Sequence, residues 1–212
     1  RVMPAEAALT DVEAAQVEPT TISVHAVRRS GVGPGDKIVV QGAGPIGLSV
    51  LQVARVYGVD EVLVVEPDED RRTLALELGA DLAIIPEAAA EIVLERTGST
   101  GADAVIECAG FPETVETAVG FCRSGGTVCL VGIADGPVSV TPREWIAREV
   151  TVVSALAYLH AEFQIAMELI ADGHVQVQQV HSSTVGLADL PAVIERLAGG
   201  SGETKILVDP TL

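Results

Sequence analysis

The chain has 212 residues, 48% of them hydrophobic, enough for one generous domain with a buried core. Its formal net charge of −17 argues against polyanionic partners, because a phosphate backbone or an anionic membrane would repel it. The longest apolar runs, such as Val128–Val131 and Val150–Val153, are far below the about 20 residues that span a bilayer. We therefore expect a cytoplasmic protein with neither nucleic acid nor membrane as a partner.

The three cysteines, Cys108, Cys122 and Cys129, lie in apolar sequence, and their spacing matches no zinc site. We expect them to be buried, reduced thiols. The sequence starts at Arg1 without an initiator Met and in the middle of a pattern, which favours a fragment of a longer protein.

A helix is expected over Thr21–Arg29, followed by a turn at Gly31–Asp36. Beyond the turn, apolar β-branched runs alternate with amphipathic stretches, as parallel strands joined by crossover helices do. The predicted strands are Lys37–Gln41, Glu61–Glu66, Leu82–Ile85, Ala104–Glu107, Thr127–Val131 and Val150–Ser154, and the predicted helices are Ile46–Tyr57, Asp70–Leu78, Ala88–Thr97 and Glu113–Cys122, with Gly58, Gly79 and Gly98 at helix C-caps. This pattern predicts an α/β fold with a doubly wound six-stranded parallel sheet, the Rossmann arrangement.

The alternation stops after Ser154. A helix near Ala161–Ala171, a strand-like Val175–Val185, a helix near Leu187–Leu197 and a last strand Lys205–Val208 follow. These elements predict a small C-terminal α+β appendage that belongs to a second structural unit.

The segment Gly42-Ala43-Gly44-Pro45-Ile46-Gly47 follows the first strand and opens a helix, the context in which this glycine pattern indicates dinucleotide binding. Gly42 permits the tight turn, Gly44 lets the backbone approach a pyrophosphate, and Gly47 lets helix and strand pack closely. The helix N-terminus then presents free N–H groups to the phosphates. A glycine turn that binds nothing, or something else, is the alternative reading of this motif alone.

Glu66 ends the second predicted strand, about 20 residues after the motif, where an acid accepts from the ribose hydroxyls. A carboxylate there would repel a 2′-phosphate, so the sequence predicts NAD(H) rather than NADP(H). Arg71 could stack on the adenine or, against this prediction, meet a 2′-phosphate. An exposed acid without a role is the alternative for Glu66.

A wider set of segments resembles the zinc-dependent medium-chain alcohol dehydrogenases, in the branch of the polyol (sorbitol-type) and threonine dehydrogenases. The resemblance rests on the glycine motif, Glu66 and Arg71, together with Glu18-Pro19, Val24–Arg29, Gly33–Asp36, Leu78–Asp81, Asp103–Gly110, Gly125–Thr127 and Leu130–Gly132. It spans nearly the whole chain. The motif differs from the Gly-Gly-Val-Gly form of the zinc-free quinone reductases.

The resemblance implies that residues 25–157 form the cofactor domain, and that residues 1–24 and 158–212 belong to a catalytic domain whose remainder lies outside this chain. It implies that the motif residues, Glu66 and Arg71 contact NAD, and that further contacts come from Ala109, Val131, Ser154, Thr21 and Lys205. In the polyol branch the glutamate at the position of Glu18 lies in or beside the catalytic zinc shell, which makes Glu18 a candidate metal-site residue. A glutamate near a helix N-terminus is the alternative, and Lys205 could equally be a solvated lysine.

The leading hypothesis is an oxidoreductase that moves a hydride between NAD(H) and a secondary alcohol or polyol, with the alcohol or ketone as substrate. Zinc is expected for the full-length protein, and this chain alone should show little turnover; its catalytic residues are unknown. His25, His160, His174 and His181 share no spacing with acids or cysteines that a metal site needs, so we interpret them as structural.

The sequence also bears on oligomer formation and leaves two alternative functions open. A hydrophobic sheet edge at Val150–Ser154 favours a homodimer or homotetramer. The alternatives are a non-catalytic dinucleotide-binding or dimerisation module, and a zinc-free reductase of the same superfamily.

Overall fold

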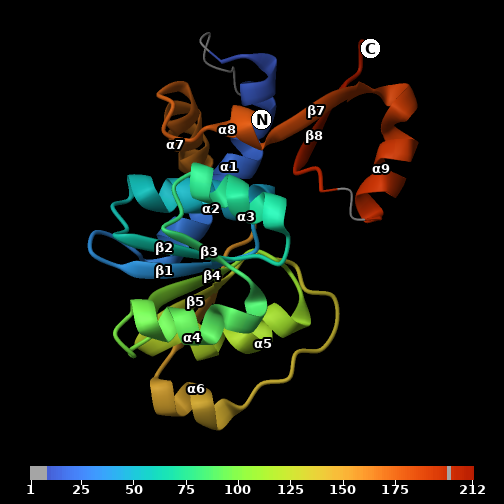
Figure 1. The fold of residues 1–212 in the computed structure, drawn as a ribbon. Coiled ribbons are helices and arrows are strands. Elements are labelled where there is room, and N and C mark those ends of the chain that lie inside the picture. The colour runs from blue at the N-terminus through green and yellow to red at the C-terminus, as the bar shows by residue number, and fades with distance from the viewer. Residues whose placement is uncertain (1–8, 200–201) are drawn as a thin grey trace.

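A computed structural model describes residues 9–199 and 202–212, and its centre is a parallel sheet of six strands (Figure 1). The strands lie in the order β3-β2-β1-β4-β5-β6, so the winding reverses between β1 and β4. Their bounds are β1 Lys37–Gln41, β2 Glu61–Val65, β3 Leu82–Ile84, β4 Ala102–Glu107, β5 Cys122–Leu130 and β6 Thr151–Ser154. This arrangement confirms the predicted doubly wound sheet.

Helices cover both faces of the sheet (Figure 1). The helices on one face are α1 (Asp11–Ser30), α2 (Pro45–Val56) and α3 (Glu69–Glu77), and those on the other are α4 (Pro86–Arg96), α5 (Pro112–Phe121) and α6 (Pro142–Arg148). We call the helices α1, α2 and α3 the first helical layer and α4, α5 and α6 the second. Along β1, the side chains of Ile38 and Val40 pack against the first layer, and that of Val39 packs against the second. Because both faces are covered, the central strands are continuous apolar runs rather than alternating ones.

Proline and glycine set the ends of the predicted helices. Helices α2, α4 and α5 each begin at a proline, where the missing N–H costs least. Gly58, Gly79 and Gly98 follow the ends of α2, α3 and α4 with φ of +85°, +104° and +59°. These left-handed conformations confirm the predicted C-cap glycines.

The sequence prediction was wrong in several places. Strand β5 begins at Cys122, which was predicted to end a helix, rather than at Thr127. The first helix begins at Asp11 rather than Thr21, because Thr10 caps its N-terminus and Pro19 is accommodated inside it. Helix α6 was not predicted. The strand-like Val175–Val185 contains a short helix, α8 (Val177–Val180), before β7 (His181–Gly186), since the apolar side chains of Val177 and Val180 pack into the helical layer.

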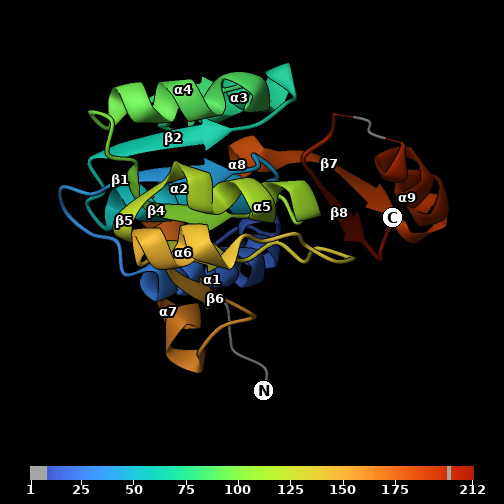
Figure 2. The same cartoon turned by 90° about the horizontal axis from the view of Figure 1, so that it is seen from below.

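The elements after β6 form two groups. Helix α7 (His160–Ala171) and α8 pack on α1 within the first helical layer, and the buried carboxylate of Glu162 lies 2.9 Å from His25 Nδ1. The rest forms a separate two-stranded parallel sheet of β7 and β8 (Lys205–Asp209), joined by a 3-10 turn (Leu187–Asp189) and α9 (Leu190–Ala198). Figure 2 shows this unit standing beside the main sheet, which confirms the predicted C-terminal α+β appendage from His181 onward. The helix predicted near Ala161–Ala171 was wrongly assigned to that appendage, because its apolar face packs into the core of the main domain.

Among the described residues, no helix is both long enough and apolar enough to cross a membrane.

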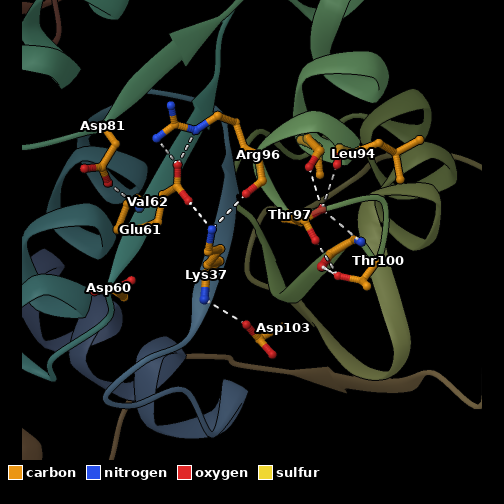
Figure 3. Close-up of polar contacts among 12 residues, drawn as sticks. Lys37, Asp60, Glu61, Val62, Asp81, Leu94, Arg96, Thr97, Thr100 and Asp103 are labelled. Atoms are coloured by element: carbon orange, nitrogen blue, oxygen red, sulfur yellow. Dashed lines mark hydrogen bonds and ion pairs between the residues drawn. The ribbon is translucent and has the colours of Figure 1, made fainter.

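Ion pairs close the amino-terminal edge of the sheet (Figure 3). Glu61, only 6% exposed, lies between Lys37, whose Nζ is 2.9 Å from Oε2, and the guanidinium of Arg96. Lys37 Nζ also donates to the carbonyl of Arg96 at 2.8 Å, and its backbone amide donates to Asp103 Oδ2 at 2.8 Å. One buried carboxylate thus joins β1, β2 and α4.

Replacing that carboxylate should destabilise the protein. We expect Glu61→Gln to lower the free energy of unfolding by about 1–2 kcal/mol, less than for a fully buried pair because both cations are partly solvated. Urea denaturation measures the change. The exposed Glu91 on α4 provides the control, and Glu91→Gln should change stability by less than about 0.5 kcal/mol. Equal losses in both variants would contradict a specific role for the ion pairs.

Candidate functional site

A cavity of about 600 Å³ lies where β1, β2 and β4 end, at the reversal of strand order. Ligands of doubly wound sheets bind at this position, since the loops after neighbouring strands diverge there. The residues that line the cavity are Gln41, Gly42, Gly44, Val65, Glu66, Pro67, Asp68, Arg71, Pro86, Cys108, Ala109, Phe111, Glu113, Thr114, Thr117, Phe121 and Gly202. The two loops after β1 and β2 form one wall, and the loop after β4 with α5 forms the other.

The three motif glycines occupy three different environments. Gly42 has φ of +92°, a conformation that favours glycine and turns the chain out of β1. A Cβ on Gly47 would lie 2.0 Å from the carbonyl oxygen of Gly42, so only glycine lets α2 approach this turn. Gly44, the N-cap of α2, has open space where its Cβ would be, with no atom within 4 Å. The start of α2 therefore presents bare backbone to the cavity.

Glu66 joins the loops after β1 and β2. Glu66 is buried, with only 5% of its surface exposed. Its Oε2 accepts a hydrogen bond from the amide of Ala43 at 2.7 Å, and its Oε1 accepts one from the amide of Asp68 at 3.0 Å. Asp68 in turn accepts from the amide of Arg71 at 3.0 Å and caps α3. These bonds fix both loops in place before any ligand binds.

Arg71 brings an unpaired donor to the cavity. Within the described part of the chain, its Nε is buried and has no hydrogen-bond partner. Because buried donors are nearly always paired in proteins, this N–H fits a site that a polar ligand completes.

Of the predicted cofactor residues, Gly42, Gly44, Glu66, Arg71 and Ala109 line this cavity. Pro45 and Lys205 line a second, small cavity next to it, together with Pro19 and Thr20 of α1. The first residue of β8 therefore lies close to the first residue of α2.

The remaining predicted residues do not line the main cavity. Ile46 is half-buried, and its carbonyl accepts from Ser23 Oγ at 3.3 Å. Thr21 is fully buried and donates to the carbonyl of Val17 within α1 at 2.7 Å. Val131 is half-buried, and Ser154 is exposed at the end of β6.

Sequence reasoning missed Glu107, the last residue of β4. It is fully buried, and its Oε1 accepts from the amides of Ala109 and Gly110 and from Thr114 Oγ1, each at 2.8 Å. A Cβ on Gly132 would lie 2.3 Å from the amide nitrogen of Gly110, so the loop after β5 requires glycine where it meets the loop after β4. The available signal was an acid that ends an apolar strand and precedes a glycine.

Zinc does not fit the residues described here. Glu18 is exposed on α1, and the described ranges contain no group of three or more His, Cys, Asp or Glu side chains that could hold a metal ion. His25 pairs with Glu162, and His181 Nε2 lies 2.9 Å from Thr184 Oγ1. No chemical step through zinc follows from this part of the chain.

All three cysteines are free, as the sequence predicted; Cys122 and Cys129 are buried, whereas Cys108 is half-buried. Burial raises the pKa of Cys108 well above its ordinary value, and it raises the pKa values of Cys122 and Cys129 to about 11. Since the thiolate is the reactive form, these groups are inert near neutral pH, even though Cys108 lines the cavity.

Alkylation should show this inertness. At pH 8 we expect iodoacetamide to label the native thiols slowly, with labelling rising only as the pH approaches the raised pKa values, and to label all three cysteines rapidly in denaturant. Intact-mass spectrometry counts the adducts. Rapid labelling of Cys108 in the native protein would contradict the expectation.

Two glycine variants should separate packing from binding. We expect Gly47→Ala to cost about 3 kcal/mol of stability, because the new methyl group would meet backbone. Gly44→Ala should change stability by less than about 0.5 kcal/mol, because its methyl group would point into open space. Urea denaturation compares the two, and a large loss for Gly44→Ala would mean that the start of α2 is more crowded than the structure indicates.

Comparison with known proteins gives three findings. Residues 45–172 match the family model described as zinc-binding dehydrogenase. L-idonate 5-dehydrogenase of Vitis vinifera and sorbitol dehydrogenase of Arabidopsis thaliana are each 33% identical over 203 residues, covering 92% of this chain and 55% and 56% of those proteins. The solved structure of a zinc-binding dehydrogenase from Sinorhizobium meliloti 1021, bound to NADP, has 31% identity and a TM-score of 0.90, covering 98% of this chain and 62% of that one. This chain spans about half the length of the curated relatives it matches.

Proposed function

Because the chain belongs to the zinc-binding dehydrogenase family, we propose that it is the NAD(H)-binding part of an oxidoreductase that transfers a hydride between this cofactor and a secondary alcohol or polyol. The observation that carries the proposal is the cavity at the reversal of strand order, edged by the glycine turn and by Glu66. The curated relatives named above, an idonate and a sorbitol dehydrogenase, support the polyol class.

The residues of this chain bind and orient the cofactor. The amides at the start of α2 hold the pyrophosphate, and Gly44 leaves room for it because it has no Cβ. Glu66 lies beside the ribose hydroxyls, and Arg71 flanks the adenosine. When bound, the nicotinamide supplies the hydride chemistry.

The preference for NAD(H) rests on charge. A buried carboxylate at Glu66 would lie against a 2′-phosphate, with its oxygens already held by two amides, so it would not swing away easily. Arg71 provides the opposing attraction. The relative from Sinorhizobium meliloti was solved with NADP, so both cofactors belong in the test.

The activity of the whole protein is part of the proposal. We place zinc, the rest of the substrate pocket and turnover outside the described residues, with Glu18 of α1 beside the metal. The boundaries at residues 24 and 157 remain a proposal about origin rather than packing, because residue 24 lies within α1 and the helices α7 and α8 pack on α1. We also propose a cytoplasmic protein that forms dimers or tetramers through β6, which lies at the edge of the sheet.

Titration of this chain with NADH and NADPH, by calorimetry, tests the site. We expect NADH to bind at least about tenfold more tightly, or about 1.4 kcal/mol. Glu66→Gln should reduce the ratio of the NADH affinity to the NADPH affinity. Gly44→Ala, which we expect to fold normally, should weaken NADH binding about tenfold, because its methyl group would project toward the pyrophosphate.

The other outcomes are equally informative. A preference for NADPH would remove the role given to Glu66. Absence of binding of either nucleotide would reject the cofactor site and favour a module that only assembles through β6.

A further inference from the structure

Phe111 is exposed in a place where an aromatic ring has no packing role. It is 61% exposed and lines the cavity, whereas Phe121, at the end of α5, also lines the cavity but is buried in the core. Phe111 is one of only three phenylalanines in this chain, in which aromatic residues make up 3% of the sequence. An exposed ring on the wall of a ligand cavity is the kind of surface that flat ligands use.

The backbone beneath Phe111 is held firmly. Phe111 is the N-cap of α5; its amide donates to Thr114 Oγ1 at 3.3 Å, and its carbonyl oxygen lies 2.8 Å from the same hydroxyl. That hydroxyl also lies 2.8 Å from the carboxylate of the fully buried Glu107. The ring is therefore mounted on a turn that is anchored to the end of β4.

The opposite wall carries a complementary group. Arg71, on α3, belongs to the side of β1 where β2 lies, whereas Phe111 belongs to the side where β4 lies. Glu66 and the glycine turn occupy the part of the cavity proposed for the ribose and pyrophosphate. The space between α3 and the start of α5 is left for the base.

We propose that Phe111 is a stacking surface for the purine base of the dinucleotide, and that Glu107 positions it through Thr114. This inference rests on the proposed function, because it assigns the base to the same cavity. A guanidinium plane at Arg71 and an aromatic ring at Phe111 can cover the two faces of one flat base, and stacking of this kind does not require a particular hydrogen-bond pattern.

Calorimetry with NADH and with ADP-ribose, which has the adenine but no nicotinamide, tests the inference. We expect Phe111→Ala to weaken both ligands about tenfold, the effect of about 1.4 kcal/mol of base stacking. Leu187→Ala is the matched control, because Leu187 is 54% exposed and lies outside the cavity; it should bind both ligands as the wild type does.

Phe111→Trp supplies a readout that a purely structural role would not move. It should keep the affinity for ADP-ribose within about threefold, since an indole ring also stacks. ADP-ribose should quench its tryptophan emission but leave that of the wild type unchanged, because the single native tryptophan, Trp145, does not line the cavity.

Two results would overturn the stacking role alone: wild-type affinity in Phe111→Ala, or unchanged emission of Phe111→Trp on saturation with ADP-ribose. If the wild type binds neither ligand, the inference fails together with the proposed function, so the two failures are distinguishable.

Discussion

Two buried carboxylates hold the cavity open. Glu66 directly follows β2 and accepts backbone N–H groups from the loops after β1 and β2. Glu107 ends β4 and accepts backbone N–H groups from the loop that follows it. Without these acceptors, amides at Ala43, Ala109 and Gly110 would need other partners in a poorly solvated place, which costs free energy for each unpaired group. The loops could then collapse into the space a ligand needs. Preorganisation of the site thus depends on acids that accept from the protein's own backbone, through both oxygens of Glu66 and through Oε1 of Glu107.

The amino-terminal edge of the sheet is stabilised by ion pairs instead. There Glu61 and Asp103 meet Lys37, Arg96 and Arg123, so acids are neutralised by cations and the edge is closed. At the carboxyl edge the acids accept neutral amides, and cationic Arg71 keeps an unpaired N–H. The amino-terminal edge is thus closed by ion pairs, whereas the carboxyl edge keeps the Arg71 Nε donor without a partner among the described residues.

The sequence predicted what depends on local pattern. Continuous apolar runs located β1 to its exact bounds, and Gly58 and Gly79 marked helix ends because their conformation is intrinsic to glycine. The strand prediction was wrong at Val177 and Val180, since a short apolar run is equally compatible with a strand and with a buried helical turn. In the site, the spacing from Gly42 to Glu66 was visible within one βαβ unit.

Glu107 and Phe111 were not predictable for a physical reason. The importance of Glu107 comes from contacts with the loops after two different strands: its carboxylate accepts from Ala109 and Gly110, and its backbone carbonyl accepts from Val131 and Gly132. Phe111 reads as one more apolar residue at a helix start until its exposure is known.

The terminal residues are joined to the site rather than appended to it. Residues of α7 and α8 pack into the same layer as α1 and α2, and Lys205 of β8 lines a small cavity with Pro45, the first residue of α2. Pro19, the neighbour of Glu18 on α1, lines it too. Three segments that are distant in sequence thus meet behind the glycine turn. Since Pro45 and Lys205 line the same small cavity, the contacts behind the glycine turn connect the start of α2 with the first residue of β8 in the C-terminal unit.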